Sequence, residues 1–406
     1  MNRISVKAAV QVAILLLCVT ASFILGTRML TQGSYSFPSY DSVAAATPTP
    51  PPTASCQLPQ NITSEYEVYR HIHEANFSAC MAGQWVYEPS QAFVSSPKYV
   101  QCLDQELQGN CHDPSAWENT NSKAKESRHE SLLKNAVSNS PGILNGSDPW
   151  AWQSNLSNYK VVTYNNHEHE QYRKRISTIL SNRTIYLVGD SLTRQWGQTM
   201  RCEIMHILGK SNEVADTTVS YLQMHVGFED HLLRRYGDPF RNHATERDYV
   251  IFNFGHHVGK KLGDDWPPKY TNILKDALAM DFGKIPDHHI FFRTTTVRHF
   301  LANQGDWNTN SSKAGGIAPN MQATWNTYGG NLPELPRQNL IAFNVLLRDS
   351  MHNNSRRYKI LDTSPMMLAR GDASFDGSHF CLPGPMQYWS RMLYYQIEQN
   401  NKLLQE

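Results

Sequence analysis

The chain lacks several features that mark common functional classes. Lys and Arg number 37 against 36 Asp and Glu, so there is no excess of basic charge. Proteins that bind nucleic acid usually need a basic surface, and we therefore expect no nucleic-acid partner. The 17 histidines and seven cysteines show no spacing typical of a zinc site, so we predict no metal. The sequence also shows no internal repeat and no glycine-rich loop of the kind that binds phosphates.

One long apolar stretch is present, and it lies at the N-terminus. It runs from Ala8 to Gly26, and Arg3 and Lys7 precede it. Its length is near the ~20 residues that a helix needs to span a bilayer. A cleavable signal peptide, the alternative, has a shorter apolar region followed by a small-residue cleavage site. We favour a cytoplasmic tail and an uncleaved signal-anchor helix over residues 1–30, with the tail placed in the cytoplasm by its positive charge.

Two further segments follow the predicted anchor. Residues 31–55 are rich in Pro, Thr and Ser, a composition that builds no core and that proline keeps extended, so we interpret them as a stem. Residues 56–406 are expected to form the lumenal domain. The chain is 40% hydrophobic over 406 residues, which is enough for one large domain or two smaller ones. Within this domain, residues 56–180 read as an irregular part rich in Cys and Trp, and residues 181–406 as the core.

The predicted lumenal domain has the cysteines and sequons of a protein in an oxidising compartment. Six cysteines lie outside the apolar stretch, an even number that favours disulfides over free thiols and leaves every pairing open: Cys56, Cys80, Cys102, Cys111, Cys202 and Cys381. Seven Asn-X-Ser/Thr sequons predict glycosylation, at Asn61, Asn76, Asn145, Asn155, Asn182, Asn310 and Asn353.

The pattern after residue 180 is that of an α/β fold. Short apolar runs bounded by Gly, Asp, Asn or Pro predict buried parallel strands, at Thr184–Val188, Tyr249–Phe254, His289–Thr294 and, more weakly, Tyr358–Asp362. The stretches between and after them are compatible with helices, at 191–208, 267–281, 337–349 and 385–404. This alternation predicts a doubly wound α/β/α sandwich with a mostly parallel central sheet. Ligands of such folds bind at the carboxyl ends of the strands.

Two short segments hold residues suited to nucleophilic catalysis. Gly189-Asp190-Ser191 ends a predicted strand and opens a predicted helix, and Asp376 and His379 lie near the C-terminus. A serine hydroxyl is a poor nucleophile near neutral pH, because it needs a histidine to take its proton and a carboxylate to orient that histidine. The two segments together contain all three groups, which makes acyl transfer the leading hypothesis.

Each segment also has a simpler interpretation. Asp and Ser are both good N-caps, so Asp190 and Ser191 could serve only to start a helix, and Asp-Gly-Ser at 376–378 is ordinary turn chemistry. The clean strand before Ser191 favours the functional interpretation. A residue at a helix N-terminus has a backbone N–H free to face a developing oxyanion. We expect Asp190 to cap the helix or order the loop.

The same segments resemble blocks of a known superfamily. Gly-Asp-Ser at 189–191 resembles the first block of the SGNH/GDSL hydrolases, and Asp-Gly-Ser-His at 376–379 resembles their last block. More narrowly, the chain resembles the PC-esterase family of trichome-birefringence-like polysaccharide O-acetyltransferases. Four further stretches carry this resemblance, in the family's order: Cys80-Met-Ala-Gly-Gln-Trp-Val, Phe252-Asn-Phe-Gly-His, Phe292-Arg-Thr with Arg298-His-Phe and Gly305-Asp-Trp-Asn, and His379-Phe-Cys-Leu-Pro-Gly. The chain departs from the family at Gly377 and near Ser311, where relatives often have cysteine.

The resemblance implies roles for individual residues. Ser191 would be the nucleophile, His379 the general base and then the general acid, and Asp376 the group that orients His379. Asn253 and Gly255 would help the Ser191 N–H to stabilise the oxyanion. The remaining candidates would line the site, and they are Gly189, His256, Arg194, Arg293 and His299.

Two further expectations concern sugar binding and one disulfide. Arginine suits an anionic donor or a uronic acid, and Trp307 with Trp266 or Trp325 could stack on sugar rings. The alternative for the tryptophans is core packing. The resemblance also implies a Cys111–Cys381 disulfide that would tie the N-terminal part to the loop beside His379.

The resemblance implies a single-pass type II protein of the Golgi membrane with a lumenal catalytic domain. It would move an acetyl group through a serine acyl-enzyme onto a sugar hydroxyl of a polysaccharide or glycan. No bound cofactor is expected, and acetyl-CoA or another acetylated donor would be a co-substrate. The first alternative is a carbohydrate O-acetylesterase, which would use the same catalytic residues with water as the acceptor. A non-catalytic glycan-binding protein is the second alternative.

Overall fold

The protein is described from a computed structural model. The structure describes residues 64–74, 82–87, 102, 150–156, 159–162, 169–206, 217–224, 240–298, 335–349, 358–368, 370, 373, 378–380, 382 and 384–403. The chain separates into two compact units, Met1–Pro52 and Thr53–Glu406, and every described residue belongs to the second. The predicted anchor and stem therefore lie outside the described residues. Within these ranges, no helix is both long enough and apolar enough to cross a bilayer.

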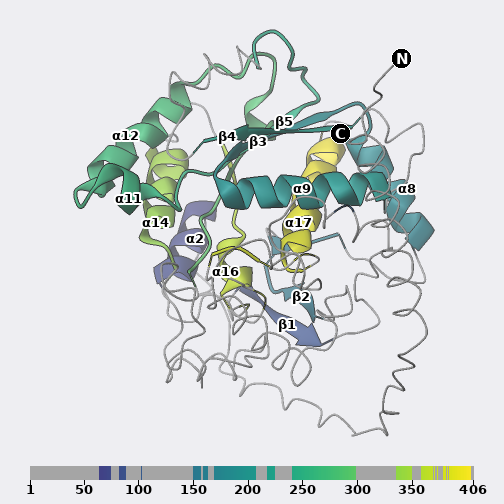
Figure 1. Ribbon diagram of the computed structural model, residues 1–406, viewed down its shortest axis with the longest axis horizontal. Helices are drawn as coiled ribbons and strands as arrows, with labels where there is room; N and C mark the ends of the chain where they lie inside the picture. The colour runs from purple at the N-terminus through teal and green to yellow at the C-terminus, as the bar shows by residue number, and fades with distance from the viewer. Residues whose placement is uncertain are drawn as a thin grey trace, which may run out of the picture. The chain divides into compact units, whose positions relative to one another are not determined.

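A parallel sheet of five strands forms the centre of the fold (Figure 1). The strands are β3 (Thr184–Gly189), β4 (Thr218–Gln223), β5 (Tyr249–Phe252), β6 (Ile290–Arg293) and β7 (Lys359–Leu361), in the spatial order β4-β3-β5-β6-β7. Every residue of β5 and β6 is buried, as expected for central strands covered on both faces. The α/β class and the four predicted strands are confirmed. The edge strand β4 is missing from the sequence prediction because only two of its six residues are buried, so its pattern is not that of a core strand.

The helices of the described chain form two groups. In the first, α9 (Ser191–His206) packs against α17 (Met386–Leu403), and α17 packs against α8 (His169–Leu180). In the second, α12 (Trp266–Ala279) packs against α11 (Val258–Leu262) and α14 (Arg337–Phe343), and α14 packs against α2 (Glu65–Glu74). Figure 1 shows the two groups on different sides of the molecule. The arrangement is consistent with a three-layer α/β fold.

The remaining elements are short, and they complete the core. A π-helical segment, η5 (Asn344–Asp349), continues α14, so the predicted helix 337–349 is one continuous helical segment with a change of type. A 3₁₀ turn, η4 (Asp287–His289), leads into β6, and α16 (Ser364–Met367) follows β7. The predicted helices 191–208, 267–281 and 385–404 are confirmed as α9, α12 and α17, within one to two residues at each end.

The prediction that residues 56–180 are irregular is wrong for the described part of that range. Strand β1 (Gly83–Tyr87) pairs in antiparallel fashion with β2 (Trp150–Ser154), so that Trp85 lies opposite Trp152. The indole N–H of Trp85 donates to the backbone oxygen of Met366 at 2.6 Å, which fixes the two-stranded sheet to α16. Such a pairing joins residues far apart in the chain, and local periodicity carries no signal for it.

Helices α2 and α8 are further regular elements in that range. The buried residues Tyr172, Ile176, Ile179 and Leu180 of α8 follow the spacing of one helix face, and charged residues occupy positions between them. The sequence therefore contains the periodic signal for α8, which the sequence analysis missed.

A disulfide ties the N-terminal part to the core. Cys102 and Cys202 are bonded, with Cα atoms 5.8 Å apart and a sequence separation of 100 residues. Cys202 lies on α9, so the bond attaches the N-terminal part directly to the helix that begins at Ser191. The other four candidate cysteines, Cys56, Cys80, Cys111 and Cys381, lie outside the described residues, and the Cys111–Cys381 pairing stays a prediction.

Two predicted glycosylation sites fall within the described chain. Asn155 follows β2 and Asn182 lies in the turn between α8 and β3, and both are exposed. Asn182 has a φ of 51°, a left-handed conformation that asparagine tolerates better than most residues. The other five sequons, Asn61, Asn76, Asn145, Asn310 and Asn353, are outside the described residues.

A buried carboxyl group joins the three helices of the first group. Glu203 of α9 is fully buried, and it accepts hydrogen bonds from the hydroxyls of Tyr172 of α8 at 2.9 Å and Tyr394 of α17 at 3.3 Å. Burial raises the pKa of Glu203 to about 7, although the charge of Arg391 and the two tyrosine hydrogen bonds oppose the shift.

This raised pKa predicts that stability falls as the pH rises. The unfolded chain releases the Glu203 proton near pH 4.5 and the folded chain near pH 7. The protonated carboxyl therefore contributes its full stabilisation of the fold below pH 4.5, and this contribution is lost as the pH rises to about 7. The shift corresponds to about 3 kcal/mol. Glu203→Gln should abolish this loss, measured as the free energy of unfolding in urea at pH 4 and pH 8. Glu170→Gln, at an exposed position of α8, should retain it, and equal pH slopes for Glu203→Gln and the unmodified protein would contradict the assignment.

Candidate active site

The order of the strands places one crevice at the centre of the sheet. From β3 the chain passes first to β4 on one side, and β5 then lies on the other side of β3. The carboxyl ends of β3 and β5 therefore flank the point where the direction of winding reverses, which is where doubly wound sheets bind ligands. Ser191 begins α9 directly after β3, and Asn253 to His256 directly follow β5. Two predicted sets of site residues thus meet at this crevice.

The structure brings Ser191 and His379 together although 188 residues separate them in the chain. The Nε2 atom of His379 lies 2.8 Å from the hydroxyl oxygen of Ser191, within hydrogen-bond distance, and both residues are half-buried. A histidine nitrogen at this distance can take the proton of a serine hydroxyl as the oxygen attacks. The third predicted member, Asp376, and the predicted site residue His299 lie outside the described residues.

Asp190 caps helix α9, as predicted. The cap does not use the backbone N–H of Ser191. Its carboxylate oxygen Oδ1 accepts the backbone N–H groups of Leu192 at 3.1 Å and Thr193 at 3.5 Å. The hydroxyl of Tyr221 on β4 donates to the backbone oxygens of Gly189 and Asp190, which holds the turn before the helix. The first N–H of a helix has no partner within the helix, so the Ser191 N–H is available to a negatively charged oxygen.

Two of the predicted glycines are required by close packing. A Cβ at Gly189 would lie 2.3 Å from the hydroxyl oxygen of Thr193 and 3.0 Å from the backbone oxygen of Asn253. A Cβ at Gly255 would lie 1.6 Å from the hydroxyl oxygen of Thr295. Any side chain at either position would push the ends of β3, β5 and β6 apart.

The side chain of Asn253 does not face a ligand, which corrects its predicted role as an oxyanion donor. Its amide nitrogen donates to the backbone oxygen of Arg293 at 2.7 Å and to the hydroxyl of Thr295 at 3.2 Å. Both N–H bonds are thereby used, and the residue is 1% exposed. The amide joins the end of β5 to the end of β6, because the neighbouring strand offers two acceptors at that point.

The predicted ligand-binding role of Arg293 is also wrong, because its side chain is fully buried. The guanidinium lies 4.6 Å from the centre of the Trp389 ring and donates to the hydroxyl of Thr193 at 3.3 Å. Burial lowers the pKa of Arg293 to about 10, and the negative charge of Asp190 opposes that shift. Arg293 therefore supports the first turn of α9 from behind. Arg194 is exposed on that turn.

His256 lies close enough to His379 for the charge of His379 to affect the pKa of His256. It is 8% exposed, and its Nε2 atom has no hydrogen-bond partner in the described part of the chain. Burial lowers the pKa of His256 to about 4, Asp190 opposes the shift, and the charges of Arg298, His257 and His379 add to it. The imidazole is therefore neutral at neutral pH, and Nε2 can serve as a hydrogen-bonding group for a bound molecule.

Gln195 is a site residue that the sequence analysis missed. Its amide nitrogen donates to the backbone oxygen of Phe380 at 2.7 Å, and its amide oxygen accepts the backbone N–H of Phe380 at 3.2 Å. Gln195 lies one helical turn after Ser191, on the same face of α9. The paired hydrogen bonds therefore hold the residue next to His379 against the helix that carries Ser191. The spacing Ser191–Gln195 is visible in the sequence, but the partner is not.

No metal site accompanies these groups within the described ranges. No set of three or more His, Cys, Asp or Glu side chains there is arranged to hold a metal ion.

We expect Gln195 to control the rate of serine acylation more than substrate affinity. Gln195→Leu removes both bonds to Phe380, and Gln195→Glu keeps the acceptor oxygen but loses the donor. Displacement of a catalytic group by about 1 Å lowers rates by on the order of 100-fold, so kcat for a small activated acetyl ester should fall by 10- to 100-fold in Gln195→Leu, with KM little changed. Steady-state kinetics measures both constants.

Gln198→Leu, one turn further along α9 and also buried, controls for general damage to the helix. Melting temperatures of both variants report on folding. An equal fall in kcat for Gln198→Leu, or a raised KM with unchanged kcat for Gln195→Leu, would contradict the positioning role.

Comparisons with known proteins add no identification. No family model matches the chain, and no curated protein matches it. Among solved structures, one similar chain is Bna3p of Saccharomyces cerevisiae, provisionally assigned as a kynurenine aminotransferase. It is 12% identical, the match covers 85% of this chain and 72% of that chain, and the TM-score is 0.16. A match this weak supports no inference about the fold or the function of this chain.

Proposed function

We propose that the protein is an O-acetyltransferase that forms an acyl-enzyme on Ser191. The distance of 2.8 Å between the Ser191 hydroxyl and His379 Nε2, at the winding reversal of the sheet, is the observation that carries this proposal. A serine that serves only as a helix cap has no need of a histidine nitrogen on its hydroxyl. The motifs at 189–191 and 376–384, similar to those of the PC-esterase family, support the same chemistry and an SGNH/GDSL-like three-layer fold.

The first half of the reaction transfers the acetyl group to the protein. His379 Nε2 accepts the Ser191 proton as the hydroxyl oxygen attacks the carbonyl carbon of an acetylated donor. The carbonyl oxygen becomes an oxyanion, and the backbone N–H of Ser191 stabilises it. The bond between the acetyl group and the donor then breaks, and His379 returns the proton to the departing group. In this proposal Asp376 orients His379, whose Nδ1 atom is protonated.

The second half transfers the acetyl group to the acceptor. A sugar hydroxyl of a polysaccharide or glycan gives its proton to His379 and attacks the acetyl carbonyl carbon. The ester bond to Ser191 breaks, and His379 returns the proton to the serine oxygen, which restores the starting state. Hydrolysis follows the same steps with water in place of the sugar, so the esterase alternative uses the same residues.

The proposed location is the Golgi membrane, with residues 56–406 in the lumen. The apolar stretch, the stem composition and the sequons support it, as does the Cys102–Cys202 disulfide, since disulfides persist in oxidising compartments. A resident anchored enzyme fits glycan biosynthesis better than a secreted hydrolase does. Acetyl-CoA or another acetylated compound would be the donor.

The proposal is tested by mass spectrometry of the full-length protein after incubation with an activated acetyl ester. We expect an acetyl adduct on Ser191 that moves to one member of a panel of xylan, mannan and pectin oligosaccharides. Ser191→Ala should carry no adduct and should lose at least about 1000-fold in activity, because the nucleophile is gone. Ser181→Ala, at a half-buried position in the turn after α8, is the matched control and should react normally.

The other outcomes decide between the alternatives. An adduct that is lost only to water, with every acceptor present, would favour the esterase. A folded protein with no adduct, and with glycan binding that survives Ser191→Ala, would favour the non-catalytic glycan-binding protein and overturn the proposal.

A further inference from the structure

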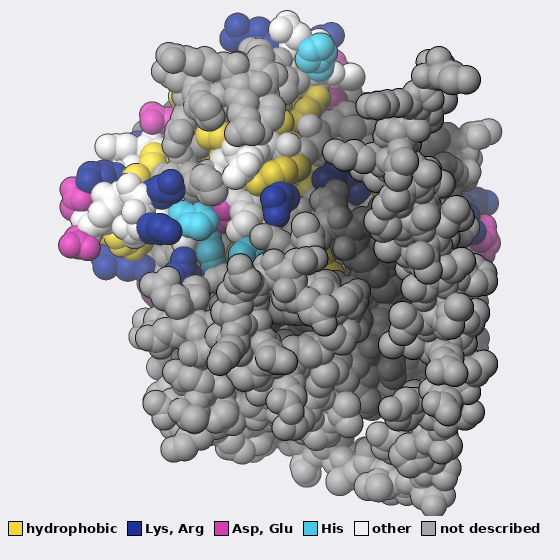
Figure 2. All heavy atoms as spheres, in the orientation of Figure 1, with side chains coloured by type: hydrophobic (Ala, Val, Ile, Leu, Met, Phe, Trp, Pro, Cys, Tyr) yellow, Lys and Arg dark blue, Asp and Glu magenta, His cyan; other side chains and the backbone are white. Residues whose placement is uncertain are grey.

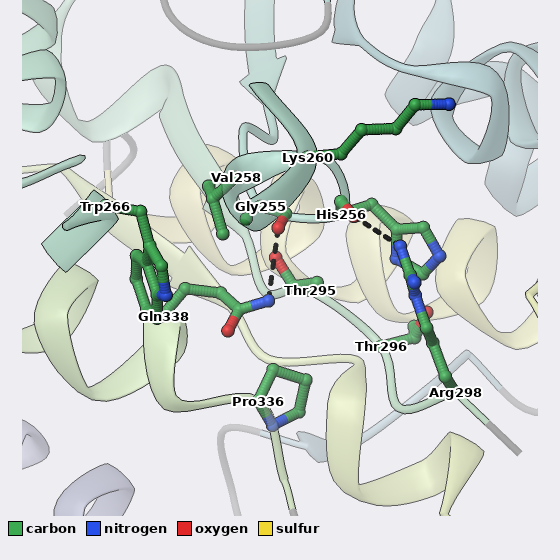
Figure 3. A pocket seen from close by; sticks show the side chains of 11 residues that line it. Gly255, His256, Val258, Lys260, Trp266, Thr295, Thr296, Arg298, Pro336 and Gln338 are labelled. Atoms are coloured by element: carbon green, nitrogen blue, oxygen red, sulfur yellow. Dashed lines mark hydrogen bonds between the residues drawn. The ribbon is translucent and has the colours of Figure 1, made fainter. Parts of the chain in front are cut away.

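A cavity of about 640 Å³ opens beside the candidate active site, between the segment after β5, the segment after β6 and the start of α14. This volume is within the usual range of ligand sites. Among the residues that line it are His256, Lys260, Trp266, Thr295, Thr296 and Arg298 (Figure 3). Gly255 and His256 directly follow β5, so the cavity begins at the crevice where Ser191 and His379 meet.

The charged groups that the described residues supply to this cavity are cationic. Lys260 and Arg298 line it and are exposed, and none of the described lining residues is acidic. Figure 2 shows lysine, arginine and histidine side chains on the surface around α11 and α12, with acidic side chains among them. One guanidinium nitrogen of Arg298 donates to the backbone oxygen of His256 at 2.6 Å, which anchors the side chain. Within the described ranges its other N–H groups have no acceptor and can bind a ligand.

The two cations of the cavity have no acidic partner within the described ranges, in contrast to two nearby surface cations. Lys269 of α12 pairs with Asp265 at 2.6 Å, and Arg241 pairs with Asp281 at 3.2 Å. No ion pair to Lys260 or Arg298 occurs within the described ranges. An arginine held at one nitrogen is suited to a carboxylate, which can accept two parallel hydrogen bonds from the guanidinium.

The opposite wall of the cavity is apolar. Trp266, Val258 and Pro336 form it, and Figure 3 shows the indole of Trp266 on the side away from Arg298. Two buried polar atoms complete the lining without a hydrogen-bond partner in the described chain, the Nε2 atom of His256 and the hydroxyl of Thr296, which is 1% exposed. Because these two atoms line the cavity, they can hydrogen-bond to the hydroxyl groups of a ligand there.

We propose that this cavity is the acceptor subsite and that it binds an acidic sugar. The carboxylate of a uronic acid residue pairs with Arg298, and the apolar face of the ring packs against Trp266. Its hydroxyls meet His256 and Thr296, on the side toward Ser191. This assignment rests on the proposed acetyl transfer, because it supplies the second substrate of that reaction. It names the substrate class as a glycan that contains uronic acid.

The assignment is tested by isothermal titration calorimetry with the full chain carrying Ser191→Ala. The probes are a trimer of galacturonic acid and the same trimer with its carboxyls methyl-esterified, which differ in charge and in the added methyl groups. We expect the acidic trimer to bind at least about tenfold more tightly, as hydrogen bonds to charged groups predict. Arg298→Ala should remove this preference, and Trp266→Ala should weaken the binding of both trimers.

Arg241→Ala is the matched control, because it removes an exposed arginine outside the cavity and should leave both dissociation constants unchanged. Thermal melting checks that each variant is folded. Binding to the Ser191→Ala protein needs no acyl transfer, so a failure here is distinct from the absence of an acetyl adduct on Ser191.

Three results would overturn the inference. The first is equal binding of the acidic and esterified trimers, and the second is an unchanged preference in folded Arg298→Ala. The third is a protein that does not bind the acidic trimer but binds free coenzyme A, with that binding lost in Arg298→Ala; this result would assign the cations to the phosphates of a donor.

Discussion

The start of helix α9 at the end of β3 fixes the positions of most groups in the candidate site. Asp190 accepts the second and third N–H groups of the helix, so the helix begins at Ser191 and its first N–H remains available. The same helix carries Gln195, which binds Phe380 and so holds His379 near Ser191. A shift of the helix start by one residue would rotate the serine by about 100° away from the histidine.

Further along, the helix is attached to the rest of the domain by two interactions of different kinds. Cys202 is bonded to Cys102, and Glu203 accepts hydrogen bonds from α8 and α17. Both are buried and both lie at the end of α9 remote from Ser191. The end near Ser191 is therefore positioned by the capping carboxylate and the glutamine, and the other end by a covalent bond and a buried carboxyl group. This arrangement favours a rigid nucleophile, which preorganised catalysis requires.

Buried charge behind Ser191 explains why Arg293, which was predicted to bind a ligand, has a structural role. Asp190 and Arg293 are both fully buried, and the negative charge of Asp190 favours the charged form of Arg293. An isolated guanidinium in this position would be strongly destabilising, and the charge of Asp190 offsets part of that cost. In sequence, Arg293 at a strand end looks like an arginine that reaches for a ligand. Only the packing of Trp389 over its guanidinium shows that no ligand can reach it.

The sequence could predict the features that depend on local pattern. Continuous apolar runs gave the positions of β3, β5, β6 and β7, and the Gly-Asp-Ser turn placed Ser191 at a strand end. Features that depend on contacts distant in the chain could not be predicted in this way. The pairing of β1 with β2, the edge strand β4 and the bond from Gln195 to Phe380 each join residues whose local patterns carry no mark of their partner. Asn253 is an intermediate case, since its position after β5 was predicted and its hydrogen-bond partners were not.

In the proposed function, the difference between a transferase and an esterase depends on the cavity that begins after β5 rather than on the serine itself. Both proposed reactions use Ser191 and His379 in the same way, and bulk water is always present as a competing acceptor. A sugar hydroxyl held in the attacking position has an effective concentration far above that of water, on the order of 10⁵ M or more. In this proposal Arg298 and Trp266 hold one sugar, because charge fixes one end of the ring and an apolar surface covers its face. The binding energy of these groups, which do not react, would thus determine which acceptor takes the acetyl group.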